Sequence, residues 1–463
     1  MGRCVSRLFA VLLSSSALIG TAYAADLPEP VVPAGDWTGF HIGVGGGYGG
    51  VNHRLALDVE GFGDVLSLSG VGGEGGLFTV EAGYDHQFSN NFVVGILGDY
   101  TYSGIGTELD VDFFDANFTL DASHSFSVLG RLGWLANPDT LIYGLVGWTW
   151  TEFEGDLEFD GDGTSYSFDL DGLTVGAGIE TRFTPNITGK LEYRYTDYED
   201  NSLISGPAFG EFLDFYNDTS MQTIRAVVSY RFGNPGGYVT PTADFTPVPV
   251  ANWTGLRIGA GGGYGHINHE LSLDIEGENL ATFDGVSGEG GLWTAEIGFD
   301  FQFANDFVAG IQFDYTGSSI ETEAELNLGF PGFTGYKLEA SDSYTVAGRL
   351  GYLANPDTLV YGLIGWTWTD FDQSLEIVGD PIFEDVVNGF DADGLTVGAG
   401  IETVLAENFT GKLEYRYTDY GKLNVFEFGV PVGDIAILDG EVNNDISVQS
   451  VRAVISYKLP ILN

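Results

Sequence analysis

The sequence predicts an all-β protein, a transmembrane antiparallel β-barrel built as two tandem eight-stranded up-and-down units. Three observations predict this fold. Polar and apolar residues alternate with a period of two, the connections between the alternating segments are short and long in turn, and the whole pattern occurs twice. Barrels of the outer membrane combine these features, because each strand has a lipid face and an interior face, with short turns at one end and longer loops at the other.

The clearest strand covers residues 187–196. Its apolar, aromatic and glycine residues fall on one face, and its Thr, Lys, Glu and Arg residues fall on the other. Strict alternation of this kind is typical of a half-buried strand. A tilted strand of about nine to eleven residues is long enough to cross a bilayer. The same pattern predicts eight strands in the first copy: 40–48, 78–88, 92–102, 126–134, 141–153, 173–183, 187–196 and 224–232.

The connections favour a membrane barrel over a pair of soluble β-sandwiches. A sandwich would also show alternation, but it would not explain why tight turns and long loops follow each other strictly. We expect the tight turns on the periplasmic side and the long loops outside. The tight turns are 89–91, 136–140 and 184–186, and the long loops are 49–77, 103–125, 154–172 and 197–223. Aromatic residues expected at the two rims are Trp37, Phe88, Phe92, Trp134, Phe183 and Phe232 at one end and Tyr102, Trp150 and Tyr198 at the other.

An internal duplication defines the domains. The block LANPDTL at 135–141 recurs unchanged at 353–359, and GKLEYRYTDY at 189–198 recurs at 411–420. We expect one barrel repeat at 25–233, a Pro- and Gly-bearing periplasmic linker at 234–251 and a second repeat at 252–463. The alternative is a single sixteen-stranded barrel, a size that leaves an aqueous pore. The long linker favours two barrels.

The first residues have the pattern of a signal peptide, expected at 1–24. Arg3 and Arg7 precede an apolar run, and Ala22-Tyr23-Ala24 forms the cleavage site. The only cysteine, Cys4, lies in this segment, which excludes a disulfide framework or a Cys-based zinc site in the mature chain. The composition also excludes nucleic acid as a partner, since 17 basic residues against 66 acidic ones give a net charge of -49.

The alternation places charged residues inside each barrel. A Lys or Arg that faced lipid at mid-membrane would cost about 2–4 kcal/mol. Bases and acids are nearly balanced in each set, so we expect a structural network of ion pairs that plugs the interior. The inward set is Glu81, Asp99, Arg131, Glu180, Lys190, Glu192, Arg194 and Arg225 in the first copy and Arg257, Glu296, Asp314, Arg349, Glu402, Lys412, Glu414, Arg416 and Arg452 in the second.

The excess negative charge is expected on the external loops, for instance at 110–121, 156–171 and 321–325. These loops would act as a solubilising surface, or as a contact surface for an external partner or for divalent cations that bridge to lipopolysaccharide phosphates. Asp160 and Asp162 only faintly resemble a calcium loop, because the terminal glutamate is missing. Gly45, Gly47 and Gly50 fit a dinucleotide motif, but no helix follows them. His53 and His269 occupy equivalent places without a nucleophile nearby. We therefore expect no catalytic site, metal or cofactor.

Four motifs carry a resemblance to a known family. They are WTGF at 37–40, GRLG at 130–133, GLTVGAGIE at 172–180 and the GKLEYRY block at 189–195. The chain resembles the outer-membrane immunogenic protein family, which implies eight-stranded, porin-like surface barrels of Gram-negative bacteria. The expected function is a non-enzymatic surface protein that supports envelope integrity and external contacts. The alternative is a porin-type channel for small, preferentially cationic solutes. Expected partners are outer-membrane lipid and lipopolysaccharide, the barrel-assembly machinery and an external partner of the acidic loops.

Overall fold

The structure is a computed structural model that describes most of the chain from residue 36 to residue 459. The described ranges are 36–59, 63–88, 91–111, 116–159, 162–199, 201–208, 211–232, 252–275, 277–304, 306–325, 332–378, 386–432 and 436–459. The expected signal peptide (1–24) and linker (234–251) lie outside them. Among these residues, none forms a helix long and apolar enough to cross a membrane.

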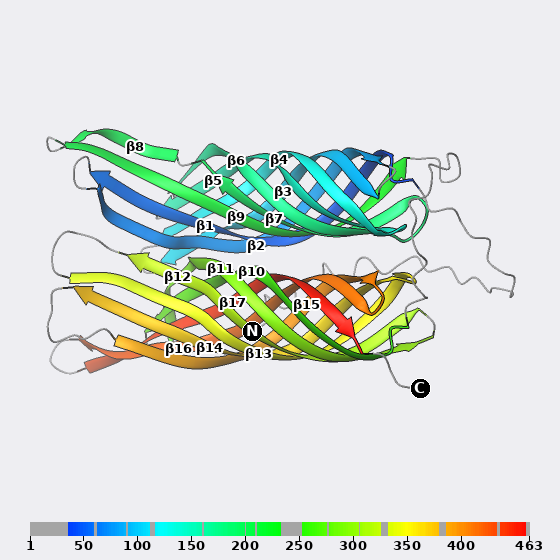
Figure 1. The fold of residues 1–463 in the computed structure, drawn as a ribbon. Coiled ribbons are helices and arrows are strands. Elements are labelled where there is room, and N and C mark those ends of the chain that lie inside the picture. Colours follow the sequence, from blue (N-terminus) through cyan, green and yellow to red (C-terminus); the bar gives the residue numbers. More distant parts are fainter. Residues whose placement is uncertain are drawn as a thin grey trace, which may run out of the picture. The chain divides into compact units, whose positions relative to one another are not determined.

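The described residues form seventeen strands, coloured along the chain in Figure 1. Those of the first half are β1 (Gly39–Val59), β2 (Gly63–Gln87), β3 (Phe92–Val111), β4 (Ala116–Asn137), β5 (Thr140–Phe159), β6 (Asp162–Arg182), β7 (Ile187–Tyr198), β8 (Asn201–Ala208) and β9 (Glu211–Phe232). Those of the second half are β10 (Gly255–Ile275), β11 (Glu278–Phe303), β12 (Phe307–Glu325), β13 (Gly332–Asn355), β14 (Thr358–Val378), β15 (Val386–Ala406), β16 (Phe409–Val432) and β17 (Ala436–Lys458).

Antiparallel pairing returns each half to its own first strand. β1 pairs with β2 and also with β9, where Phe40 lies opposite Phe232. β10 pairs with β11 and also with β17, where Arg257 lies opposite Lys458. The first ring therefore runs through β1 to β7 and β9, while β8 forms a side hairpin on β9. Short bridges from β11 to β2 and β3 join the two rings into one hydrogen-bonded network.

Most strands are far longer than the sequence predicted. They contain 19 to 26 residues, except β7 with 12 and β8 with 8. The expected long loops are largely strand, because the pairing continues past the lipid-crossing segment into tall hairpins. β5 and β6, for example, stay in one register from Thr140–Thr181 to Phe159–Asp162. The tight turns lie where the sequence placed them, and we call that end of each ring the turn end and the other the hairpin end.

The two faces of each strand differ as the alternation predicts. On the outside, Ile96 and Leu132 are each 58% exposed, while Asp99 and Arg131 on the same strands are buried. An apolar outer band of this kind is what lipid requires. Most expected rim aromatics, such as Phe88, Phe232 and Trp150, are exposed at this surface.

Two expected rim aromatics are inside instead. Trp37 is fully buried at the turn end, where its indole N–H donates to the Pro138 carbonyl at 3.1 Å and its ring lies against Arg182 and Arg231. Tyr198 is also buried, and its hydroxyl lies 2.7 Å from that of Thr151. The prediction for Trp37 was wrong because the segment before β1 turns across the ring. For Tyr198 it was wrong because the inward side of the hairpin end is apolar.

Apolar clusters close both ends of each ring interior. In the first ring, one cluster at the turn end includes Trp37, Leu97 and Leu141, and one at the hairpin end includes Ile105 and Phe153. The second ring has the corresponding pair of clusters. Charged and hydroxyl side chains occupy the space between them, and they form the site described below.

Phe153 offers a test of the hairpin-end cluster. It is fully buried and packs on Phe168 with a centroid distance of 5.5 Å, so Phe153→Ala leaves a cavity. We expect the free energy of unfolding to fall by about 3–5 kcal/mol in urea titrations of the refolded chain in detergent. Phe159→Ala on the same strand, which removes an exposed ring, should change it by less than about 0.5 kcal/mol. Equal losses would show that the cluster is not a packed core.

Candidate functional site

All the charged residues assigned to the interior from the sequence are buried within the two rings. They project from several strands toward a common centre, because residues two apart on a strand share a face. In the first ring they lie on β2, β3, β4, β6, β7 and β9, and in the second on β10 to β13 and β15 to β17. The alternation does not predict which of these acids and bases form ion pairs with each other.

Near the turn end of the first ring, two arginines and two acids form a closed square. Arg131 donates to Asp85 at 2.7 Å and to Glu180 at 2.8 Å. Arg231 binds the same two carboxylates, at 2.6 Å and 3.3 Å. Charge-assisted bonds of this type are among the strongest in proteins. Each guanidinium thus bridges two acids that come from different strands.

A second chain of ion pairs continues toward the hairpin end. Lys190 bridges Glu81 at 2.7 Å and Glu192 at 3.1 Å. Arg194 then links Glu192 to Asp99, at 2.7 Å to each. Arg225 donates to the other oxygen of Asp99 at 2.9 Å, and the Tyr143 hydroxyl donates to Glu192 at 2.5 Å. Every carboxylate in this chain therefore has a cation or a hydroxyl donor.

The second ring repeats the arrangement. Arg349 binds Asp300 and Glu402, each at 2.7 Å. Lys412 bridges Glu296 at 2.6 Å and Glu414 at 3.2 Å. Its outer members complete the chain: Arg416 binds Glu414 at 2.7 Å and Asp314 at 2.8 Å, Arg452 binds Asp314 at 3.0 Å, and Tyr361 donates to Glu414 at 2.6 Å.

One guanidinium has changed strand between the rings. In the first ring, Arg231 on β9 holds Asp85, and His41 lies directly opposite it on β1. In the second ring, β17 has Lys458 at that place, and Arg257 on β10 holds Asp300 at 3.1 Å and also pairs with Glu296. The first strand and the last strand of each ring are paired, and these two positions lie opposite each other in that pair. A cation at either position can therefore reach the equivalent acid, Asp85 or Asp300.

Sequence reasoning missed three members of the network: Asp85, Arg231 and Asp300. The period of two would have found them, since Asp85 follows Glu81 by four residues and Arg231 follows Arg225 by six. With these included, five acids and five Lys or Arg side chains take part in each network among the described residues. Each network is thus electrically balanced as well as buried.

A layer of hydroxyls lies beside the charges. Thr149 bonds Ser127 at 3.0 Å and Thr174 at 2.6 Å, and Thr174 bonds Thr196 at 2.9 Å. A matching row in the second ring joins Thr345, Thr367, Thr396 and Thr418. Each hydroxyl can donate and accept, so such a row satisfies its members without water.

The two histidines weighed as catalytic candidates lie within hydrogen-bond distance of side chains inside the rings. His53 lies 2.9 Å from the Thr219 hydroxyl, and His269 lies 3.1 Å from Thr322 and from Asn444. Within the part of the chain that the structure describes, no group of three or more His, Cys, Asp or Glu side chains could hold a metal ion. Asp160 lies outside the described residues.

The outer hairpins carry acids on their outward side. Gly106, Asp121 and Glu154 lie in one row across β3, β4 and β5, with Glu108 and Asp156 close by. Burial, together with the negative charges of Glu108, Asp156 and Glu154, raises the pKa of Asp121. The expected acidic loop 110–121 is therefore partly an acidic strand surface, and its residues 112–115 lie outside the described ranges.

Comparison with known proteins identifies the fold family. The model of the outer membrane protein beta-barrel domain matches residues 10–232 and again 246–458. The 31 kDa outer-membrane immunogenic protein of Brucella melitensis is 32% identical over 224 residues, which cover 47% of this chain and 88% of that protein. The 22 kDa outer membrane protein of Rhizobium leguminosarum bv. viciae is 37% identical over 179 residues, 38% of this chain and 72% of that protein.

Solved structures of outer-membrane proteins are similar to this chain only at low identity. The attachment invasion locus protein Ail of Yersinia pestis is 19% identical with a TM-score of 0.24, covering 42% of this chain and 99% of Ail. A FadL homologue of Pseudomonas aeruginosa is 11% identical with a TM-score of 0.28, covering 91% of this chain and 90% of that one. The domain match and the curated relatives confirm the predicted family and its duplication. The chain belongs to the outer-membrane β-barrel family of Gram-negative bacteria, carries the family's barrel domain twice and resides in the outer membrane.

Proposed function

We propose that the chain is a non-enzymatic surface protein of the outer membrane, made of two barrels whose interiors are closed to solutes. Its tall acidic hairpins face the outside, where they contribute to envelope integrity and to external contacts. The observation that carries the proposal is the balanced ion-pair network in each ring, in which all ten Lys and Arg members of the two networks are bonded to carboxylates.

Charges that line an aqueous pore are solvated by the water of that pore. Here Arg131, Glu180 and Glu192 are instead almost fully buried and bonded to one another. Apolar clusters lie between this network and both ends of the first ring. An eight-stranded barrel is just wide enough for side chains to fill it. These features together favour a plug over a channel.

The outer hairpins support the second part of the proposal. Asp121, Glu154, Glu108 and Asp156 present a negative surface beyond the apolar band. The chain as a whole has 66 acidic against 17 basic residues, and the network uses equal numbers of both, so the excess acids lie elsewhere. Such a surface repels anions and attracts cations or basic partners at low ionic strength.

Conductance tests the closed interior directly. The refolded chain in planar bilayers should give no large, stable current steps, with insertion checked by protease protection of the barrel. The alternative, a porin made of one sixteen-stranded barrel, predicts large cation-preferring steps. Their appearance would replace the proposal with that channel.

Breaking the network should destabilise the barrel. Asp85→Ala leaves Arg131 and Arg231 with one acid fewer in a buried setting. We expect a loss of about 3–5 kcal/mol in the free energy of unfolding, because an uncompensated buried charge remains. Asp156→Ala, which removes an acid from the exposed hairpin, is the control and should cause little loss. A small effect of Asp85→Ala would mean that water reaches the network.

The outer acids should respond to pH with a defined sign. The pKa of Asp121 is raised in the folded state, so its favourable contribution is present at pH below its ordinary value of 3.8 and is lost as the pH rises through the raised value. Asp121→Asn should therefore stabilise the outer β3–β4 hairpin at pH 7 and low salt but not at pH 3. Amide hydrogen exchange in this hairpin measures the difference. Greater protection of the wild type at pH 7 would contradict the expectation.

A further inference from the structure

Two carboxylates lie on the outside of the rings, where lipid would be the default neighbour. Glu81 on β2 and Glu296 on β11 point inward, and Glu74 and Glu289 lie an odd number of positions before them in unbroken registers. Both therefore point outward. A charged or polar group directed at lipid is costly unless it finds a partner.

Each of these carboxylates is bonded by donors from the other half of the chain. Glu74 accepts from the Tyr417 hydroxyl at 2.9 Å and from the Gln449 side-chain amide at 3.3 Å. Glu289 accepts from the equivalent residues of the first half, Tyr195 at 3.2 Å and Gln222 at 2.9 Å. The two sets of bonds are equivalent, because each residue in one set occupies the same position in its repeat as the corresponding residue in the other set.

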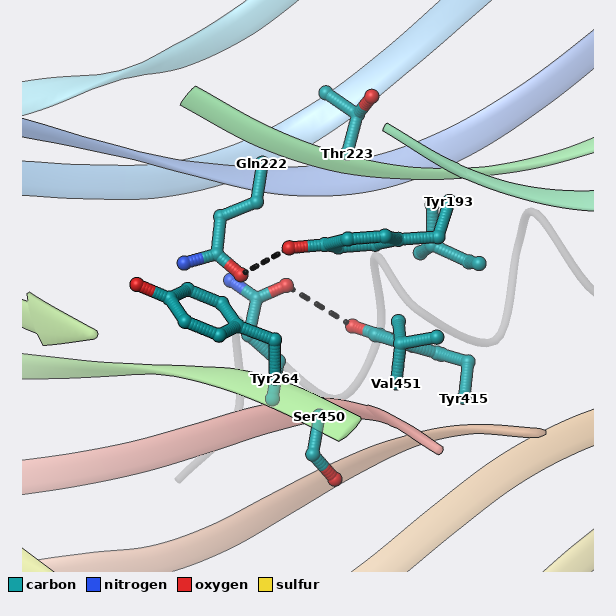
Figure 2. Close-up of a pocket in the computed structure, with 9 residues that line it drawn as sticks. Tyr193, Gln222, Thr223, Tyr264, Tyr415, Ser450 and Val451 are labelled. Atoms are coloured by element: carbon teal, nitrogen blue, oxygen red, sulfur yellow. Dashed lines mark hydrogen bonds between the residues drawn. The ribbon is translucent and has the colours of Figure 1, made fainter. Parts of the chain in front are cut away.

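Neighbouring residues hold the donors in position. Figure 2 shows Tyr193 and Gln222 of the first half facing Tyr264 and Tyr415 of the second across a small pocket. The Tyr193 hydroxyl donates to the Gln222 side-chain carbonyl at 3.3 Å, which turns the amide N–H of Gln222 toward Glu289. Tyr415 does the same for Gln449 at 3.4 Å.

Below this polar row the contact is apolar. Ile224 faces outward yet is only 5% exposed, whereas Ile96, which also faces outward, is 58% exposed. Residues of both halves form one cluster here: Ile179, Leu191 and Ile224 with Ile401, Leu413 and Val451. At the turn end, Asn137 donates to Thr403 and Asn355 donates to Thr181, each at 3.0 Å. We call this surface, from the Glu74–Glu289 row to the Asn137 and Asn355 contacts, the seam.

Equivalent residues that touch each other mark a pseudo-two-fold axis along the seam. Thr140 and Thr358, which occupy the same place in the two repeats, lie 2.7 Å apart at the hydroxyls. Val71 and Val286 pair as strand neighbours. A two-fold interface is self-complementary in this way, with each patch meeting its own copy.

Two positions on the axis break the symmetry. His266 occupies the place of Gly50, and a Cβ added at Gly50 would lie 2.5 Å from the His266 ring. Ser287 occupies the place of Gly72, and a Cβ at Gly72 would overlap the Ser287 hydroxyl as well as the Val51 carbonyl of its own half. Two first halves would meet glycine to glycine and leave gaps, and two second halves would meet side chain to side chain and clash.

We propose that the seam is a built lateral interface that holds the two barrels together within the membrane, and that Gly50 and Gly72 opposite His266 and Ser287 make each half select the unlike half. Attraction comes from the reciprocal carboxylate bonds, and discrimination comes from the steric mismatch of like halves. The proposal rests on the two-barrel arrangement of the proposed function and adds a partner for each barrel, namely the other half of this chain.

The test separates the halves after the full chain has folded. A protease site is placed within 234–251, an affinity tag is attached to the first half, and the refolded chain is cleaved in mild detergent. The second half should remain bound to the tagged first half. Gly50→Leu should lower the retained fraction about tenfold or more, as expected for overfilling a packed contact, because the nearest atoms to a Cβ at Gly50 all belong to the His266 ring of the other half. Gly76→Leu is the control, since Gly76 is also an outward glycine of the first ring but has open space around it.

A second variant guards against misfolding as the cause. Glu74→Leu suits a lipid-facing site, so the barrel should still fold and migrate as a folded species in unheated gels, while retention falls. For selectivity, chains with two different tags on the first half are mixed and cleaved. One tag should capture the second half and not the other tagged first half.

Three results would overturn the seam. They are separation of the wild-type halves, equal effects of Gly50→Leu and Gly76→Leu, and capture of one first half by another. If the folded halves separate and the bilayer shows no large current steps, the seam proposal is rejected while the proposed closed barrels are retained. Large current steps would instead reject the proposed function itself.

Discussion

The constraint on which the rest of the structure depends is that a charge cannot face lipid and cannot be buried alone. Strand alternation sends Lys190, Glu192 and Arg194 to the same side, and the narrow ring brings them to Asp99 and Glu81 from distant strands. Desolvating so many ions is expensive, and bridged geometry with full hydrogen bonding is what offsets the cost. The network therefore specifies which strands face each other across the interior, in addition to any stability that it contributes.

The transfer of one arginine between strands shows what this constraint fixes and what it leaves free. Asp85 and Asp300 need a second guanidinium, but Arg231 supplies it from β9 and Arg257 supplies it from β10. Both positions face the same acid across one strand pair. The charge at a point in space is thus maintained, while the residue that carries it is not. In the first ring His41 fills the vacated place, 3.4 Å from Asp85.

The sequence was sufficient for the strand faces, the turn ends and the inward direction of residues such as Arg194, because all of these follow from a period of two. It could not give the partners, since the bond between Arg194 and Asp99 depends on the tilt and stagger of strands 95 residues apart. The lengths predicted for the strands were also too short, because glycines and acids interrupt the apolar pattern where the hairpins leave the membrane. Trp37 was misplaced because a residue before the first strand has no alternation to follow.

The seam applies the same constraint to the outer face, and the duplication explains how it could become asymmetric. The two long blocks that recur unchanged contain Tyr195 and Thr140 and their copies Tyr417 and Thr358, so like residues meet or exchange partners across the axis. Two separate identical chains must always place the same residue on both sides of such an axis. A chain that contains both halves is free of this rule, and the His266 ring over Gly50 is an arrangement that identical chains could not adopt. Covalent linkage thus permits a closer fit at the axis than two-fold symmetry allows.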